Sequence, residues 1–236
     1  MVDGIPSFVL PDLATAHERD EWLRKQSEMQ ACDAQASMYD HLPGLRLLSP
    51  VEAYLTSRAL RSRSKQVTLL AEIGCGTGRI LQHLARLADY VIGVDFSLHS
   101  LHQCLRRMHS AGFLQKTLLI HADACFLPLA DEGLDAAASC QLIEHLPSDR
   151  LRRRAVAEMQ RVLKPGGRYA ISGYHWSLIA RLGGSKEGMH AGGIYFYRFT
   201  RDEFRQLVGA HLPVQSLRSI FGYIWLASGS KGGAND

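Results

Sequence analysis

The sequence has 236 residues, of which 46% are hydrophobic and 21% are charged, and its formal net charge is +4. This length favours one large domain with appendages over two independent domains, and the composition excludes a disordered chain. The basic excess is smaller than that of dedicated nucleic-acid binders, and the five scattered cysteines form no C-x-x-C pair that would indicate a metal site or a disulfide framework.

The first residues of the chain lack the basic region and apolar run of a signal peptide, and no stretch approaches 18 apolar residues without a charge. We therefore expect a cytoplasmic protein without membrane insertion.

The N-terminal part of the chain reads as cap helices. Residues 13–39 are polar and helix-favouring, and Pro43-Gly44 is predicted to end that region. Ser49-Pro50 supplies an N-cap and a first helical residue for another helix to about Arg63.

From residue 67 onward, short apolar runs alternate with helical stretches, which is typical of βαβ units and a parallel sheet. The expected strands are residues 68–73, 90–94, 117–121, 134–139 and 167–173. The expected helices are residues 78–87, 98–111, 148–163 and 200–209. Two apolar runs, residues 214–217 and 221–227, suit an antiparallel edge pair. The expected organisation is cap helices in residues 1–66, an α/β domain in residues 67–227 and a disordered tail in residues 228–236.

The first expected strand runs directly into a glycine-rich loop, Gly74-Cys75-Gly76-Thr77-Gly78, which is followed by a helix. Glycine lets a backbone turn sharply and approach a ligand closely. Dinucleotide-binding enzymes use a similar turn with G-x-G-x-x-G spacing, but here Arg79 occupies the place of the final glycine. Glu72 precedes the loop, and its carboxylate would repel a pyrophosphate and attract the ammonium and sulfonium of S-adenosylmethionine (SAM). The charge pattern therefore favours SAM over NAD.

Acidic residues follow the second and third expected strands. Asp95 emerges at the carboxyl edge of the sheet, where its carboxylate can accept hydrogen bonds from both ribose hydroxyls of a nucleoside. The ring of Phe96 is placed either against the adenine or in ordinary packing between strand and helix. Asp123 is placed to accept a hydrogen bond from the adenine amino group, although an isolated aspartate at such a position also forms turns.

In combination these residues resemble the class I SAM-dependent methyltransferases of the ubiquinone/menaquinone-biosynthesis-like type, with a methyltransferase domain 11. The similar strings, between about Leu69 and Ser172, are Leu70 to Arg79, Val91 to Ser97, Ala122 to Ala124 with Leu127 to Leu129, Gln141 to Leu146, and Arg161 to Gly167. The resemblance implies a Rossmann-like α/β sheet, mostly parallel with an antiparallel last strand, and N-terminal cap helices. It does not specify the methyl acceptor, because that family acts on quinones, sterols, arsenic, natural products and tRNA bases.

The resemblance also implies roles for single positions. The residues that it places around SAM are Glu72, Gly74 and Gly76 at the methionine moiety, Asp95 at the ribose, Asp123 and Ala124 at the adenine, and Gln141 just after the fourth strand. Cys75 and Phe96 are further candidate cofactor-binding residues. Tyr39 belongs to a Tyr-Asp element and either closes over the cofactor or is a cap-core aromatic. The paired acceptor-site cysteines of arsenite methyltransferases are absent from this sequence, which argues against that branch.

Methyl transfer from SAM requires mainly alignment, because the sulfonium is already an activated donor. A general base is needed only where the acceptor is a protonated group such as a hydroxyl. His145, one turn past the fourth expected strand, is a candidate base, and the alternative is that it packs beside the cofactor. His190 is a second candidate base, and no metal is expected.

We expect the acceptor site under Tyr174 to Phe199, because ligands of open α/β sheets lie beyond the carboxyl ends of the strands. Trp176, Tyr195 and Tyr197 offer flat apolar surface to an aromatic or lipid-like small molecule. His175 is a further candidate base or hydrogen-bond partner in this stretch. The alternative is an irregular loop whose aromatic residues merely pack onto the sheet.

Two other functions stay open. A tRNA-modifying methyltransferase would use the same core and would use two basic clusters, Arg58 to Lys65 and Arg150 to Arg154, as a phosphate footprint. The ordinary interpretation of such clusters is a solvated face. A non-catalytic SAM-binding protein would bind SAM without forming a methylated product. The sequence leaves open the acceptor, the methylated atom and the oligomeric state.

Overall fold

The structure is a computed structural model that describes residues 1–8, 43–62, 66–190 and 193–233. Most of the expected cap region, including Tyr39, lies outside these residues. Among the residues described, no helix is long and apolar enough to cross a membrane.

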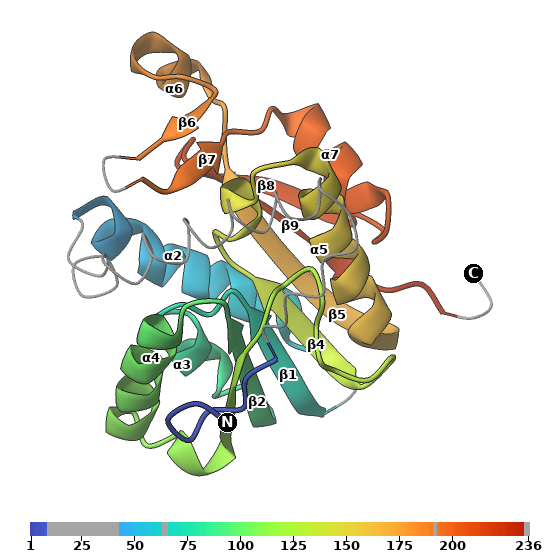
Figure 1. Ribbon diagram of the computed structural model, residues 1–236. Coiled ribbons are helices and arrows are strands. Elements are labelled where there is room, and N and C mark those ends of the chain that lie inside the picture. The colour runs from blue at the N-terminus through green and yellow to red at the C-terminus, as the bar shows by residue number, and fades with distance from the viewer. Residues whose placement is uncertain (9–42, 63–65, 191–192, 234–236) are drawn as a thin grey trace, which may run out of the picture.

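A seven-stranded sheet in the order β3-β2-β1-β4-β5-β9-β8 forms the centre of the molecule (Figure 1). The parallel strands are β1 (Val67–Ile73), β2 (Ala88–Asp95), β3 (Thr117–His121), β4 (Leu134–Ser139) and β5 (Leu163–Tyr174). β9 (Ile224–Ser230) pairs antiparallel with β5, and β8 (Ser216–Ile220) pairs antiparallel with β9 at the edge. The expected α/β fold, with its antiparallel last strands, is confirmed.

Helices cover both faces of this sheet (Figure 1). One face carries α2 (Pro43–Leu60), α3 (Leu81–Leu84) and α4 (Leu98–Ser110), and the other carries α5 (Asp149–Val162) and α7 (Arg201–Gly209). Because side chains alternate along a strand, Leu70 of β1 packs into the core of the first face, and Ala71 and Ile73 pack into the core of the second. The continuous apolar run of β1 is therefore buried on both sides.

The main helices begin at side-chain caps. The Oγ atoms of Ser97, Ser148 and Thr200 accept backbone N–H groups at the starts of α4, α5 and α7, and Thr200 forms a capping box with Glu203. These caps satisfy N–H groups that have no partner within the helix. The local signals therefore set the starts of these helices close to where the sequence predicts them.

Two helices differ from expectation. The helix after the glycine-rich loop is reduced to Leu81–Leu84, because β2 already pairs from Ala88 with Val67 of β1 and leaves few residues for helix. α2 begins at Pro43 and continues through Pro50, so neither Pro43-Gly44 nor Ser49 marks the expected boundary. Ser49 is engaged elsewhere, since its Oγ accepts a hydrogen bond from Arg79.

The two chain ends also differ from expectation. The N–H of Phe8 donates to the carbonyl of His121, and the N–H of His121 donates to the carbonyl of Pro6, so the first residues extend the β3 edge of the sheet. At the other end β9 continues to Ser230, in register with Arg168 of β5, and three residues of the expected disordered tail belong to the sheet.

The segment between β5 and α7 has more secondary structure than the sequence indicates. It contains α6 (Leu178–Gly183) and an antiparallel hairpin of β6 (Glu187–Met189) and β7 (Tyr195–Tyr197). Figure 1 shows this hairpin beyond the carboxyl end of β5, over the edge of the sheet where a ligand is expected. We call the hairpin β6–β7 the lid. Short 3-10 turns lie at η1 (Leu114–Lys116) and η2 (Ile143–His145).

Candidate functional site

The glycine-rich loop leaves open space above its middle residue. Gly76 has a φ of +51°, and a Cβ added there would meet nothing within 4 Å. A Cβ at Gly78 would instead lie 2.5 Å from the Sγ of Cys104 in α4. Glycine is therefore needed at these two positions for different reasons. Gly76 keeps the backbone accessible to a ligand, and Gly78 permits close packing on a helix.

The side chain of Cys75 donates a long hydrogen bond, 3.8 Å, from its Sγ to the carbonyl of Gly76 within this loop. Its side chain is buried, and a hydrogen bond with Cys104, together with burial, raises the pKa of the Cys75 thiol well above its ordinary value. The thiol therefore stays protonated at neutral pH and is not a nucleophile.

Asp95 holds the loop in place. One of its oxygens accepts the N–H of Gly76 at 2.7 Å, and the other accepts the N–H of Ser97 at 2.8 Å. Each carboxylate oxygen has a second lone pair, so these bonds leave capacity for ribose hydroxyls. Phe96 follows at the end of β2, where its carbonyl oxygen lies 3.1 Å from the Nε2 of His121.

Glu72 is buried at the end of β1, beside the loop, and its Oε2 has no hydrogen-bond partner. Burial raises the pKa of Glu72 well above its ordinary value, although the positive charge of Arg79 opposes the rise. A buried carboxylate without a partner is costly, and a cationic group nearby would remove that cost.

Glu52 of α2 is the centre of a buried network that the sequence analysis did not single out. Its Oε1 accepts the Oγ–H of Ser172 at 2.6 Å. Its Oε2 accepts hydrogen bonds from the Nε2 of Gln141 at 2.5 Å and from the Nη1 of Arg79 at 3.3 Å. Gln141 has the left-handed φ of +55°, and its N–H donates to Ser172 Oγ. One carboxylate therefore joins α2, the loop, the end of β4 and β5.

A third buried carboxylate, Glu144 in η2, has no hydrogen-bond partner on another residue for either oxygen. Burial raises its pKa well above the ordinary value, and both the negative charge of Glu52 and the positive charge of Arg79 act on it. In the described part of the chain, Arg79 is the cation that acts on both Glu72 and Glu144. Three buried carboxylates beside one guanidinium make a site that suits a ligand with positive charge.

Asp123 is fixed at the end of β3 by a turn of its own. Its Oδ1 accepts the N–H of Cys125 at 2.8 Å, as the turn interpretation predicts, and Ala124 between them is buried. Its carboxyl keeps further acceptor capacity toward the carboxyl edge of the sheet.

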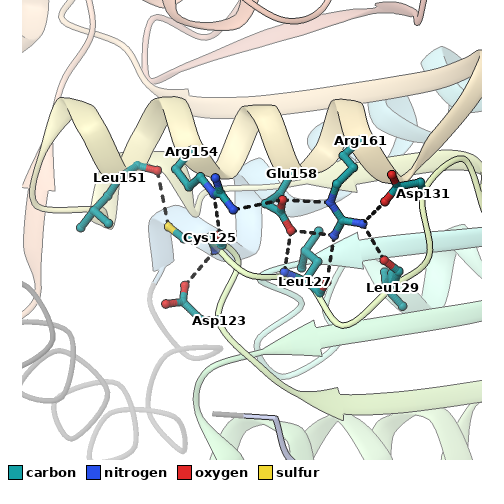
Figure 2. A network of polar contacts seen from close by, with 9 residues as sticks. All are labelled: Asp123, Cys125, Leu127, Leu129, Asp131, Leu151, Arg154, Glu158 and Arg161. Atoms are coloured by element: carbon teal, nitrogen blue, oxygen red, sulfur yellow. Dashed lines mark hydrogen bonds and ion pairs between the residues drawn. The ribbon is translucent and has the colours of Figure 1, made fainter. Parts of the chain in front are cut away.

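Figure 2 shows how the loop after Asp123 is clamped onto α5. Glu158 accepts the N–H of Leu127 at 2.8 Å, and Arg161 donates to the carbonyls of Leu127 and Leu129 and to Asp131. Burial alone would raise the pKa of Glu158, but hydrogen bonds from Arg161 and Leu127 outweigh it and hold the pKa below its ordinary value. The clamp positions the expected adenine end of the site through ionised groups.

His145, Tyr174 and His190 form a ring cluster beneath the lid. The centroid distances are 5.6 Å between His145 and Tyr174, 6.0 Å between the two histidines, and 5.9 Å between Tyr174 and His190. The Nδ1 of His145 lies 2.7 Å from the carbonyl oxygen of Tyr195. The Nε2 of His190 is buried without a partner. The structure therefore brings both candidate bases together.

Electrostatics keeps these two imidazoles neutral. Burial lowers the pKa of His145 to about 4, although the hydrogen bond to Tyr195 opposes it. Burial, and then the positive charge of Arg198, lower the pKa of His190. Both rings are uncharged at neutral pH, so each has one N–H donor and one nitrogen lone pair.

The other candidate acceptor residues have contacts elsewhere in the described part of the chain. His175 stacks on Trp225 at 3.8 Å between centroids and pairs with Ser219. The ring of Trp176 lies 5.9 Å from Arg181. Tyr197 lies 4.6 Å from the guanidinium of Arg152 and donates its hydroxyl to Glu203. Tyr195 reaches the ring cluster through its backbone carbonyl, since its hydroxyl donates to Glu187.

Sequence comparison adds a family to this geometry. Residues 71–171 match the family model described as a methyltransferase domain. The methyltransferase GfsG of Streptomyces halstedii is 34% identical over 102 residues, which is 43% of this chain and 36% of that protein. The probable tRNA methyltransferase 9B of Bos taurus is 32% identical over 127 residues, which is 54% of this chain and 25% of that protein. The chain therefore spans about a third or less of the length of these relatives.

Structure comparison extends the similarity beyond the matched domain. The solved DhpI–SAH complex has a TM-score of 0.66 at 20% sequence identity, and the match covers 89% of this chain and 97% of that one. At this identity the likeness establishes the fold, including the antiparallel edge strands that lie outside residues 71–171.

Proposed function

We propose that this protein, whose residues 71–171 are a methyltransferase domain of the class I SAM-dependent type, transfers a methyl group from SAM to a small aromatic or lipid-like molecule. The buried carboxylates beside the loop carry the proposal. Glu72, at the end of the strand that leads into the loop, has a buried oxygen without a partner, and neither oxygen of Glu144 has a partner on another residue. These features fit a cofactor that carries a sulfonium and an ammonium.

Different residues of the chain would bind different parts of this cofactor. Glu72 and the backbone at Gly76 would hold the methionine part, Asp95 the ribose, and Asp123 with Phe96 the adenine. SAM supplies an activated methyl group whose transfer requires an aligned acceptor and little acid–base chemistry. Glu52 holds Arg79 and Gln141 in place, and it is a positioning residue that stiffens the wall of this site.

The ring cluster supports a hydroxyl group as the methyl acceptor. A carbonyl oxygen can only accept a hydrogen bond, so the Nδ1 of His145 must carry the proton that it shares with Tyr195. The Nε2 of His145 then carries the lone pair of the ring. A pKa of about 4 makes this nitrogen a weak base. We therefore assign it the role of accepting and orienting an acceptor hydroxyl.

The proposal is tested by calorimetric titration with SAM and with NAD, followed by assays with methyl-labelled SAM. We expect SAM to bind and NAD not to bind, and Glu72→Gln to weaken SAM binding at least about tenfold, because a charge-assisted contact of ~1.5–3 kcal/mol is lost. Binding of NAD in place of SAM would overturn the cofactor assignment. SAM binding without a labelled product from any phenol, lipid or host extract would favour a non-catalytic protein.

A tRNA base is the second candidate acceptor, and the similarity to the probable tRNA methyltransferase 9B favours it. The labelled assay separates the two, because label would then enter tRNA and not the small-molecule fraction. Bulk tRNA binding with steep salt dependence would accompany that outcome.

A further inference from the structure

A small hollow lies between α2 and the edge strands β8 and β9, outside the site described above. It has a volume of about 150 Å³ and is lined by Leu55, Arg58, Ala59, Ser216, Arg218, Leu226 and Ser228. Arg58 follows Glu52 by nearly two helical turns, and no residue of the Glu52 network is among the lining residues. We call this hollow the Arg58–Arg218 cleft.

The charge of the cleft is one-sided. Arg58 lies in the last turn of α2, Arg218 is exposed on β8, and no carboxylate lines the hollow. Among the residues that the structure describes, neither guanidinium has an ion-pair partner. Arg79 and Arg161, by contrast, are bound to carboxylates. Two like charges around one small hollow repel each other, and an anion between them would remove the repulsion.

Neutral donors complete the cleft. Ser216 and Ser228 are direct partners across the β8–β9 ladder, and Arg218 lies two residues after Ser216, on the same face of β8. Two hydroxyls and two planar guanidinium groups match the several acceptor oxygens of a tetrahedral anion. The volume of about 150 Å³ is several times the ~30 Å³ that a water molecule occupies, so such an anion fits.

The helix end beside the cleft does not cancel this charge. The carbonyl groups at the end of a helix carry partial negative charge and repel anions. Here the Nε of Arg168 donates to the carbonyl of Ala59 at 2.7 Å, and the N–H of Arg61 donates to the carbonyl of Ser57. These carbonyls are occupied by donors, which leaves the two guanidinium groups to dominate the potential in the hollow.

The second basic cluster of the sequence has internal roles. Arg152 donates to the carbonyl of Leu146, Arg153 pairs with Asp149, and Arg154 donates to the carbonyl of Cys125. Of the two basic clusters, the one before β1 therefore has an arginine, Arg58, that lines a hollow without a carboxylate. Arg63 and Lys65 lie outside the described residues.

From these observations we propose that the Arg58–Arg218 cleft binds a phosphate group. The phosphate can come from a free or small phosphorylated molecule, or from the backbone of a polynucleotide, because the recognised chemistry is the same. This proposal does not rest on SAM binding or on the identity of the methyl acceptor.

The first arm of the test uses inorganic phosphate at constant ionic strength, with chloride as the balancing anion. Backbone amide shifts of Ser216, Arg218 and Ser228 are followed by NMR in the wild type and in Arg218→Gln and Arg58→Gln. We expect saturable shifts in the wild type and at least about tenfold weaker binding in each variant. Arg205→Gln, on the opposite face of the sheet, is the matched control and should bind like the wild type.

The second arm uses bulk tRNA and the same variants. If the cleft receives a polynucleotide, Arg58→Gln and Arg218→Gln lower the affinity and reduce the slope of log K against log salt by about 1 each, while Arg205→Gln does not. Unchanged tRNA binding with lost phosphate binding would assign the cleft to a small phosphorylated molecule. Non-saturable shifts, or phosphate binding that both cleft variants retain, would overturn the proposal. Unchanged backbone amide shifts in the parts of the protein far from the cleft would show that the variants are folded.

Discussion

The Nδ1 of His145, in the turn after β4, lies 2.7 Å from the backbone carbonyl oxygen of Tyr195, which is the first residue of lid strand β7. The two residues are 50 positions apart in the sequence. Because the carbonyl can only accept, this contact sets the tautomer of His145 and leaves the lone pair on its Nε2. The position of the lid therefore determines the orientation of the proposed acceptor-binding nitrogen.

The first prediction concerns His145 itself. His145→Ala should lower turnover of a hydroxyl acceptor about 10- to 100-fold, because the hydroxyl loses its orienting partner. SAM affinity should stay within about threefold, which is less than ~0.7 kcal/mol. Steady-state kinetics and calorimetry measure the two effects, with His211→Ala as the control. Equal turnover in both variants would remove His145 from the acceptor site.

The pH dependence of stability gives a second prediction. The folded-state pKa of His145 is about 4, below the ordinary ~6.5, so between these values the unfolded state binds more protons than the folded state. Stability therefore falls as pH falls from about 6.5 toward 4.

Other buried histidines act in the same direction, and the comparison with His145→Ala isolates this one. Urea unfolding at pH 7 and pH 5 should show that the wild type loses about 2 kcal/mol more of its free energy of unfolding than His145→Ala over this interval. Parallel losses in the two proteins would contradict a buried, neutral His145.

The lid gives the third prediction. His190 packs on Phe196 at 4.6 Å between ring centroids and faces the ring cluster, and Trp176 lies at the base of the same segment. His190→Ala or Trp176→Ala should lower turnover or raise the acceptor KM and leave SAM affinity within about threefold. If SAM affinity collapses and acceptor kinetics do not change, the lid covers the cofactor instead.

A matched pair of glycines gives the fourth prediction. Both Gly76 and Gly78 have positive φ, so alanine at either position costs about 1 kcal/mol of backbone strain. Gly76→Ala should weaken SAM binding at least about tenfold with little further loss of stability, because its Cβ enters open space.

Gly78→Ala should instead lose a further ~1–3 kcal/mol of stability, because its Cβ overlaps Cys104. Thermal unfolding and calorimetric titration of the two variants measure this contrast. Normal SAM binding by Gly76→Ala would place the cofactor elsewhere.

The clamp on the loop after β3 gives the fifth prediction. Glu158→Gln should lower the free energy of unfolding at pH 7 by about 1.5–3 kcal/mol, because charged hydrogen bonds to Arg161 and Leu127 are weakened. The folded pKa of Glu158 is lowered, so its contribution is full above the ordinary ~4.3 and is lost as pH falls below it.

The difference in free energy of unfolding between the wild type and Glu158→Gln should therefore be smaller at pH 3 than at pH 7. Arg153→Ala, which removes an exposed pair with Asp149, is the control and should cost less than about 1 kcal/mol. A difference that is equal at pH 7 and pH 3 would contradict an ionised clamp.

Local patterns in the sequence were sufficient to predict the mostly parallel sheet with its antiparallel last strands. The alternation of apolar runs and helical stretches indicates the parallel strands, and Glu72, Gly76 and Asp95 follow strands whose carboxyl ends meet at one edge. These signals are short-range, because strand period, helix caps and glycine turns depend on neighbouring residues. The wrong predictions also came from local signals. In α2, Pro50 indicates a helix start but lies inside the helix.

What the sequence by itself determined is therefore the domain type, the glycine-rich loop and the residues at the strand ends. Only the tertiary structure showed that Glu52 reaches Gln141 and Ser172, positions 89 and 120 residues away. It alone joined His145 to the carbonyl of Tyr195 and placed Arg58 beside Arg218. The physical reason is that such contacts depend on how α2, the lid and the edge strands pack against the sheet. No periodicity or spacing along the chain encodes which side chains then meet across those elements.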